Sequence, residues 1–303
     1  MIRRRESHGE RIRMSHLFVE SLYNEDKSVT IKEFTELPPS IFDKEVKMNP
    51  DIGVCSILDT ETTGLDYKKD EIIEIAIRKW LYHKKDHYLI KPIEVYSSLN
   101  EPIKNEISGF ITKITGITNE DVKGKKIDWD VVSKLISESD FVLAHNAGFD
   151  RPMIESVPQL KEVSQSVIWT CSLKQVNWAE LGFISTKQEV LGIFHGFYYT
   201  AHKALMDVDA LANILLQGNY LKTILEDAKT KHVEVDCVQA PFATKDLLKN
   251  NGFSWNAPKR FWTRSVSEPE LEAMKLFLSD EIYPQGFMKA EFTEIALNDR
   301  FKA

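Results

Sequence analysis

The sequence predicts an α/β domain, in which helices flank a sheet, followed by a small α+β domain. Between about residues 50 and 218, short apolar segments alternate with amphipathic segments, a pattern typical of strands and helices in turn. From about residue 231 to residue 303 the pattern changes to short alternating strands separated by short helices. Hydrophobic residues make up 43% and charged residues 28% of the 303 residues, as expected for a globular protein with one large domain and additions, or with two domains.

Residues 1–49 are predicted to form an N-terminal extension. The segment begins with MIRRRESHGERIRM, which is rich in arginine but is not followed by the apolar core of a secretory signal. It ends in the proline-containing stretch ELPPSIFDKEVKMNP. The sequence has no run of about 18 apolar residues, so no membrane span is expected.

Charge and cysteine content restrict the class of protein. The formal net charge of −7 argues against a general nucleic-acid coat protein, which would be basic, but is compatible with an enzyme that has a local basic track. The three cysteines, Cys55, Cys171 and Cys237, lack C-x-x-C spacing, and their odd number indicates neither a disulfide framework nor a zinc site. A reducing compartment, and hence a cytoplasmic location, is therefore expected.

The elements of the larger domain can be placed from their residue types. GVCSILDT at 53–60 and EIIEIAIRKWL at 71–81 are rich in apolar and β-branched residues, which indicates strands of a buried sheet. FVLAHN at 141–146 is another short apolar strand. HKALMDVDALANILLQG at 202–218 is predicted to be a helix, since its leucines and isoleucine recur on or near one face and a glycine ends it.

Two acids stand where the first of these strands ends, within the stretch SILDTETTGLD. Residues two apart in a strand point to the same face, so Asp59 and Glu61 should project side by side. Two such charges repel and raise each other's pKa unless a cation lies between them. This pair alone is a weak signal, because a D-x-E sequence is usually a solvated strand end.

Two further stretches place acids at the ends of predicted core elements. In VLAHNAGFD, Asp150 follows a strand and falls in the first turn of the next element. In HKALMD, His202 precedes a helix and Asp207 lies within its first two turns. Hard divalent cations such as Mg²⁺ bind carboxylate oxygens, and two such ions can stabilise the attacking and leaving oxygens of a phosphoryl displacement.

The motifs DTETTG, HNAGFD and HKALMD, in this order and at these separations, resemble the three exonuclease motifs of the DnaQ-like DEDDh exonucleases. The resemblance covers roughly residues 52–217 and includes EIIEIAI, ITGIT and WTCSL between the motifs. It implies a ribonuclease H-like fold with a mixed sheet. The position four residues before Asp207, where another branch of the family has a tyrosine, is Lys203, and the histidine spacing is that of the DEDDh branch.

The resemblance also assigns roles to individual residues. Asp59, Glu61, Asp150 and Asp207 would bind two Mg²⁺ or Mn²⁺ ions, and His202 would be the general base, a role that suits its reference pKa of about 6.5. The backbone at Thr62, Thr63 and Gly64 would cradle the terminal nucleotide, and Leu65 would wedge against its base. Asn146 would either orient a ligand carboxylate or cap the following helix, and the sequence does not separate these alternatives.

The implied function is a 3′→5′ exonuclease that hydrolyses terminal phosphodiesters and releases nucleoside 5′-monophosphates. The expected partner is a nucleic-acid 3′ end, with DNA that is single-stranded or frayed as the first choice. An RNA-trimming enzyme of the same family is an alternative, because the motifs do not separate DNA from RNA. A catalytically silent nucleic-acid-binding protein is a third alternative, but all five catalytic positions are filled.

Other polar residues near the motifs have simpler interpretations. Glu74 is expected to be a paired structural acid rather than a fifth ligand. Asp209 lies about 200° around the helix from Asp207, so only one of the two can face the site, and Asp209 is expected to be solvated. His145 is expected to support the motif loop rather than to catalyse.

The segment FATKDLLKNNGFSWNAPKRFWTR at 242–264 combines aromatic and basic residues, which is typical of surfaces that bind single strands. The alternative is that its aromatics form the core of a small domain. The segment loosely resembles helix-plus-hairpin modules appended to enzymes of DNA metabolism. The segment contains a single acid, Asp246, and five basic residues: Lys245, Lys249, Lys259, Arg260 and Arg264.

Overall fold

The computed structural model describes residues 28–284 and 286–302, so most of the predicted extension, residues 1–27, lies outside the described residues. A mixed five-stranded sheet forms the centre of the larger unit. Its strands, in spatial order, are β4 (Tyr88–Leu99), β3 (Ile72–His83), β2 (Ile52–Thr62), β5 (Phe141–Ala144) and β6 (Ile168–Cys171). β2 pairs antiparallel with β3 and parallel with β5, which confirms the predicted mixed sheet.

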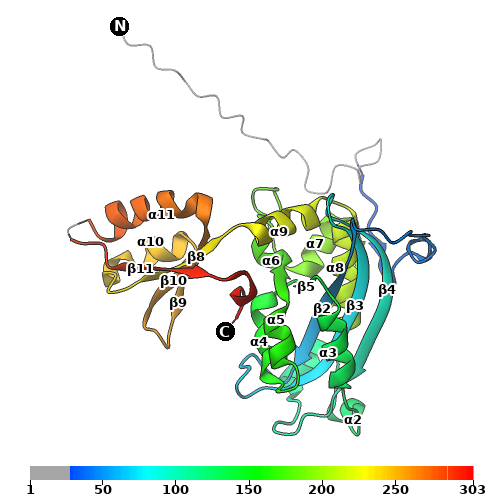
Figure 1. Ribbon diagram of the computed structural model, residues 1–303. Helices are drawn as coiled ribbons and strands as arrows, with labels where there is room; N and C mark the ends of the chain where they lie inside the picture. The colour runs from blue at the N-terminus through cyan, green and yellow to red at the C-terminus, as the bar shows by residue number, and fades with distance from the viewer. Residues whose placement is uncertain (1–27, 285, 303) are drawn as a thin grey trace.

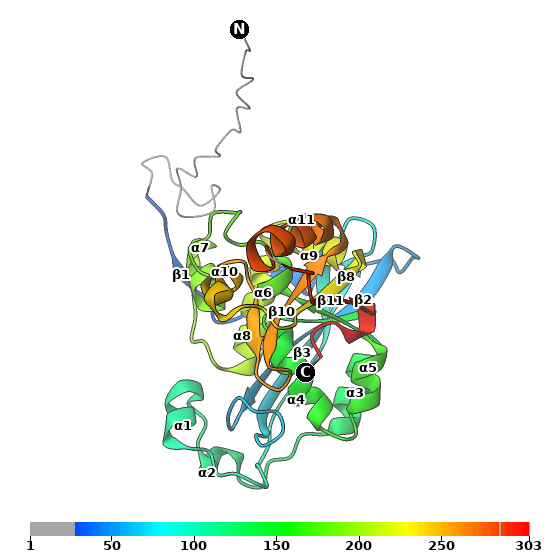
Figure 2. The same cartoon turned by 90° about the vertical axis from the view of Figure 1, so that its left-hand side faces the viewer.

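Helices cover both faces of this sheet (Figure 1). On one face, α3 (Trp129–Ser137), α4 (Ala147–Ser156) and α5 (Lys161–Ser166) enclose a core that includes Leu58 and Trp169. The other face is covered by α7 (Gln188–Phe194), α8 (Ala204–Leu216) and α9 (Tyr220–Lys229), with α6 (Ser172–Gln175) beside α9. Two short helices, α1 (Gly109–Thr115) and α2 (Asn119–Val122), lie in the connection between β4 and α3. They are seen at the lower left in Figure 2.

The strands and helices follow from the residue types. β2 and β3 are almost entirely buried, since both faces of the sheet are covered, and their long apolar runs supply the needed side chains. α8 is apolar on most of its circumference and packs against β2 and β3. The parallel register of β2 and β5 brings the end of β2 close to the start of α4, because carboxyl ends of parallel strands meet at one edge of a sheet.

The small C-terminal unit has an antiparallel four-stranded sheet with helices on one side. The order is β11 (Ala290–Ile295), β8 (His232–Cys237), β10 (Phe261–Ser267) and β9 (Ser254–Asn256), and the helices are α10 (Lys245–Asn250) and α11 (Leu271–Phe277). Its own core contains Phe253 and Leu248. Ser267, the last residue of β10, forms a capping box with Glu270, and the helical segment that leads into α11 begins there.

Segments beyond residues 50–218 complete the larger unit. Phe34 and Ile41 from the segment before β2, and Leu221 and Ile224 from α9, are buried in its core. β1 (Lys32–Glu33) pairs with β7 (Phe197–Tyr198) next to α7. We therefore propose that the nuclease unit spans residues 28–229 rather than residues 50–218.

The chain end also returns to the larger unit. The C-terminal tail, residues 296–302, leaves β11 and lies against α5 and β6, and Figure 1 shows it between the two units. Arg151 of α4 is fully buried and donates hydrogen bonds to the carbonyl oxygens of Asn298 and Arg300, each at 2.6 Å. Arg300 in turn donates to Asp227 of α9 at 2.7 Å.

Within residues 28–284 and 286–302, no helix is both long and apolar enough to cross a bilayer. The three cysteines are free and buried.

Candidate active site

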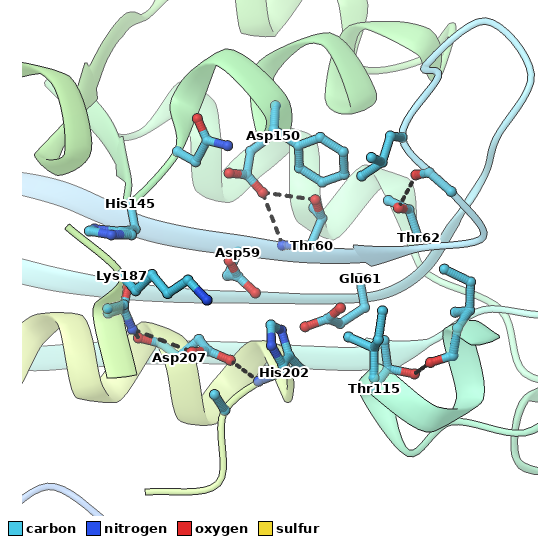
Figure 3. Close-up of a pocket in the computed structure, with 18 of the residues that line it drawn as sticks. Asp59, Thr60, Glu61, Thr62, Thr115, His145, Asp150, Lys187, His202 and Asp207 are labelled. Atoms are coloured by element: carbon cyan, nitrogen blue, oxygen red, sulfur yellow. Dashed lines mark hydrogen bonds between the residues drawn. The ribbon is translucent and has the colours of Figure 1, made fainter. Parts of the chain in front are cut away.

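A cavity of about 780 Å³ opens where β2 ends. Its walls come from the end of β2, the loop to β3, helix α1, the start of α4, residues 186–189 and the start of α8. Figure 3 shows the acids and His202 facing this space, with α1 at one end and His145 at the other. Every residue to which the family motifs assign a role lines it, Thr63, Leu65 and Asn146 included.

Three of the predicted ligand residues come together in this cavity. Carboxylate oxygens of Asp59, Glu61 and Asp207 lie within 4.8 Å of one another. Asp59 and Glu61 project from the same face of β2, as their spacing predicts, while Asp207 approaches from the first turns of α8. Strand register therefore supplies one pair of acids and helix packing supplies the third.

Asp150 lies in the first turn of α4 and is 2% exposed. Its Oδ1 accepts hydrogen bonds from the Thr60 backbone N–H at 3.1 Å and from the Thr60 hydroxyl at 2.8 Å. Thr60 lies between Asp59 and Glu61 in β2, so its side chain points to the opposite face of the strand from theirs. This direction brings it to Asp150 of α4. Asp150 borders the cavity beside the other acids but is anchored by Thr60, and it lies outside the three-acid cluster.

Hydrogen bonds hold Asp207, near the start of α8, from two sides. Asp207 Oδ2 accepts hydrogen bonds from the backbone N–H of His202 at 2.7 Å and of Lys203 at 3.1 Å. The Tyr199 hydroxyl donates to Oδ1 at 2.8 Å, and the Gln188 amide donates to the Asp207 carbonyl, also at 2.8 Å. His202 has a positive φ of 64°, so its exposed imidazole leaves the chain at a sharp turn and borders the cavity.

The acids of the cavity are held in an environment that resists ionisation. Burial, and then the charges of the neighbouring acids, raise the pKa of Asp59 well above its usual range and that of Glu61 to about 8. Burial also raises the pKa of Asp150 to about 7 and that of Asp207. Carboxylates crowded in this way lack a counter-charge. The donor set is all oxygen, so a hard divalent cation such as Mg²⁺ or Mn²⁺ fits the cluster.

The residues expected to contact a nucleotide surround one end of the cavity. Thr62 is buried and donates to the Gly64 carbonyl at 2.5 Å, which shapes the turn after β2. A Cβ at Gly64 would lie 2.5–2.6 Å from the Asp70 carboxylate, so a side chain at this position would force Asp70 to move. Leu65 is 86% exposed at the cavity rim. Asn146 occupies the N-cap position of α4, but its side chain makes no capping hydrogen bond.

Two nearby acids have structural partners. Glu74 accepts a hydrogen bond from the backbone N–H of Ala204 at 3.0 Å and so stabilises the start of α8, in agreement with a structural role. The prediction that Asp209 is solvated is wrong. Asp209 is 7% exposed and forms a two-pronged ion pair with Arg78, at 2.5 and 2.8 Å, because α8 packs its far side against β3.

His145 links two parts of the cavity wall. One ring nitrogen lies 2.8 Å from the Ser172 hydroxyl, and the other lies 2.7 Å from the Thr186 carbonyl oxygen. The histidine therefore supports the loop, as expected. Thr60, Tyr199 and Gln188, which hold two of the acids of the cavity, were not identified from the sequence. Only Thr60 had a usable signal there, since it lies between two motif acids.

A mixed sheet with this order, a cluster of acids at the end of β2 and a histidine beside it define a nuclease of the ribonuclease H-like class. The family model described as exonuclease matches residues 56–215, which is more than half of the chain. The chain therefore belongs to this exonuclease family, and the resemblance to DnaQ-like DEDDh enzymes is confirmed.

Similar proteins include two DNA polymerases III of the PolC type. The one from Lactococcus lactis subsp. lactis (strain IL1403) is 29% identical over 185 residues, which are 58% of this chain and 10% of the polymerase. The one from Caldanaerobacter subterraneus subsp. tengcongensis (strain DSM 15242 / JCM 11007 / NBRC 100824 / MB4) is 31% identical over 170 residues, which are 54% of this chain and 11% of the polymerase. The chain thus matches only about a tenth of the length of these relatives.

Solved structures with a similar fold include exonuclease X in complex with 5′ overhanging duplex DNA. It has 24% sequence identity and a TM-score of 0.40, and the match covers 56% of this chain and 92% of that one. The nuclease domain of 3′hExo, a DEDDh family member bound to rAMP, has 18% identity and a TM-score of 0.44. That match covers 56% of this chain and 93% of that one.

Proposed function

We propose that this protein is a 3′→5′ exonuclease that removes nucleoside 5′-monophosphates from DNA 3′ ends, single-stranded or frayed. The observation that carries the proposal is the cluster of Asp59, Glu61 and Asp207, with the imidazole of His202 bordering the same cavity. The DNA substrate is supported by the similarity to segments of DNA polymerases.

Asp59, Glu61, Asp150 and Asp207 are the residues that would hold two Mg²⁺ or Mn²⁺ ions. Such ions would supply Lewis-acid activation of the phosphate and stabilise the charge that develops during displacement. His202 would accept the proton of the attacking water, since its imidazole is exposed, borders the cavity and forms no hydrogen bond with residues 28–284 or 286–302. Tyr199 and Gln188 would keep Asp207 oriented.

The apolar end of the cavity suits a terminal nucleoside. Phe110, Ile111 and Ile114 of α1 line it, and Phe110 is 72% exposed. Together with Leu65 they offer apolar faces against which a base can stack, and every base has such a face. This arrangement supports removal of any nucleotide without regard to its base.

The direct test is a time course on 3′- and 5′-labelled DNA and RNA oligonucleotides of one sequence, with Mg²⁺ or Mn²⁺. Shortening from the 3′ end by single nucleotides, faster on DNA, is the expected result. Faster shortening of RNA would favour an RNA-trimming enzyme. No hydrolysis with either metal would contradict the proposal.

We expect His202→Ala to lower kcat by about 10²–10⁴-fold, the usual contribution of a general base. The Mg²⁺ concentration for half-maximal rate should change little, since the histidine acts on water rather than on the ion. Lys203→Ala is the matched control, because it alters the neighbouring exposed side chain and keeps the same backbone hydrogen bond to Asp207. A strong shift of the metal titration, with the full rate restored at saturating metal, would make His202 a ligand instead.

The small C-terminal unit is proposed to engage longer strands. Part of the predicted basic segment is not free: Lys259 pairs with Glu234 and Asp236 at 2.6 and 3.0 Å, and Arg264 donates to the Asn251 carbonyl. Phe253 belongs to the domain core. The aromatic and basic side chains of the segment that remain exposed are Phe242, Lys245, Lys249, Trp255 and Arg260, and we propose that they act together as an aromatic–basic surface.

This surface offers both stacking and charge. Phe242 is 82% exposed, with the Lys245 ammonium 4.7 Å from the centre of its ring, and Trp255 is 53% exposed. Aromatic stacking is typically worth about 1–3 kcal/mol per base, and phosphate contacts add a salt-dependent term.

We expect the double substitution Lys245→Ala with Trp255→Ala to raise KM for long single strands by about fivefold or more. The dependence of KM on salt should become flatter, because a phosphate contact is lost. Cleavage of a dinucleotide should be unaffected. Lys275→Ala with Leu276→Ala on α11 is the matched control, and equal losses on long and short substrates would contradict a binding surface.

A further inference from the structure

We infer that Lys187 binds the phosphate directly upstream of the scissile one, an inference that rests on the proposed exonuclease function. The first observation is the charge of the cavity. Five acids line it, and among the residues that the structure describes Lys187 is the only lysine or arginine to do so. The acids are Asp59, Glu61, Asp150, Glu189 and Asp207. A polyanion that enters this cavity therefore meets one fixed cationic side chain of the protein.

The ammonium of Lys187 is available to a ligand. Its side chain is 75% exposed, and the acid paired with it, Glu189, lies at 4.0 Å with a side chain that is 40% exposed. An exposed pair at this distance contributes little stability, so a phosphate can replace Glu189 at small cost. In Figure 3 the Lys187 side chain extends from its segment towards the acids.

The backbone of Lys187 is fixed from both sides by residues of the motifs. On one side the Thr186 carbonyl oxygen lies 2.7 Å from a ring nitrogen of His145. On the other side the Gln188 amide donates to the Asp207 carbonyl at 2.8 Å and to the Tyr199 hydroxyl at 2.9 Å. The lysine is thus tied to the loop of the second motif and to the metal-ligand helix of the third. Its position relative to the reacting phosphate is set by the fold.

The order of groups along the cavity assigns the phosphate. Helix α1, with Phe110 and Ile114, forms the apolar end that suits the terminal nucleoside. The acids that suit the scissile phosphate come next, and the segment that carries Lys187 lies on the side of His145, with the lysine side chain extending towards the acids (Figure 3). A strand that enters with its last nucleoside at α1 therefore brings its next phosphate to Lys187.

Two dinucleotides of the same sequence, one with a 5′-phosphate and one with a 5′-hydroxyl, test this assignment. They share the scissile bond and both bases, and differ only in the upstream phosphate. For the wild-type protein we expect kcat/KM to be about fivefold or more higher for the 5′-phosphorylated substrate, as for a partly exposed charge-assisted hydrogen bond. Lys187→Ala should bring this ratio close to one, and Lys187→Arg should keep most of it.

Lys222→Ala, an exposed lysine of α9 that does not line the cavity, is the matched control and should keep the wild-type ratio. Thermal melting of each variant checks that it is folded. A wild-type ratio of one, or a ratio that Lys187→Ala leaves unchanged, would overturn the assignment while the exonuclease function stands. Failure of the wild type to hydrolyse either dinucleotide or a longer strand would overturn the proposed function and this inference with it.

Discussion

Asp59→Ala is expected to abolish hydrolysis and to leave the protein folded. Asp59 contributes to the three-acid cluster, and within the part of the chain that the structure describes its side chain forms no hydrogen bond. The loss of activity in this variant should exceed the roughly 10–100-fold loss that follows removal of a residue that only supports a metal ligand. Turnover on a labelled oligonucleotide at saturating Mn²⁺ is the measurement, and near-normal turnover would contradict the metal assignment.

The same substitution should stabilise the metal-free protein at alkaline pH. The unfolded carboxyl groups have pKa values near 4, whereas the folded pKa is about 8 for Glu61 and about 7 for Asp150, with burial as the largest cause. The folded state then binds more protons between these values, so the free energy of unfolding falls as the pH rises from about 4 to about 8. Asp59→Ala removes one of the repelling charges and should weaken this fall.

Thermal melting in EDTA at pH 5 and pH 8 measures the effect. We expect the variant to melt above the wild type at pH 8, with a smaller difference at pH 5, and Mg²⁺ to raise the melting temperature of the wild type more than that of the variant. Asp246→Ala, an exposed acid of the small unit, is the matched control and should follow the wild type. A variant less stable than the wild type at pH 8 would contradict repulsion among the acids.

The parts of the site that could be predicted are those fixed by regular structure. The i and i+2 spacing in a strand placed Asp59 and Glu61 together, and helix periodicity separated Asp207 from Asp209. These rules depend only on local geometry. The environment of Asp209 was missed because its burial against Arg78 depends on which strand α8 covers, a tertiary contact that no local pattern specifies.

The supporting residues could not be predicted for a similar reason. Tyr199, Gln188 and Lys187 lie in the segment between α6 and α8, where the apolar spacing is irregular. Their roles arise when His145 and Asp207 bind neighbouring backbone and side-chain groups. The domain boundary is another example. The sequence predicts that the larger domain ends at residue 218 and that a second domain begins at residue 231. In the structure, α9 and the C-terminal tail both pack on the larger unit.

The contact between Arg151 and the C-terminal tail shows how far this packing extends. The Nε of the fully buried Arg151 pairs with Glu155 at 2.7 Å, and its two terminal NH groups donate to carbonyl oxygens that the tail supplies, so these two donors are satisfied only while the tail is bound. Asp227 receives Arg300 of the tail. Burial would raise the pKa of Asp227, but hydrogen bonds from His232 and Gln175 and the charge of Arg300 outweigh it and lower the pKa to about 2. This contribution to stability is present above about pH 4 and is lost as the pH falls towards 2.

We therefore expect Arg151→Met to destabilise the protein by about 3–5 kcal/mol at pH 7, the usual cost of breaking a buried, hydrogen-bonded charge. Urea unfolding of the full chain measures this, with Arg260→Met as the matched control. Arg260 is exposed, so its substitution should change stability by no more than about 0.5 kcal/mol. Although Arg151 follows Asp150, a proposed metal ligand, dinucleotide cleavage at 25 °C should stay within about twofold of the wild type, because Thr60 anchors the Asp150 carboxylate independently of the tail. If Arg151→Met were as stable as Arg260→Met, the tail would not be a structural part of the nuclease unit.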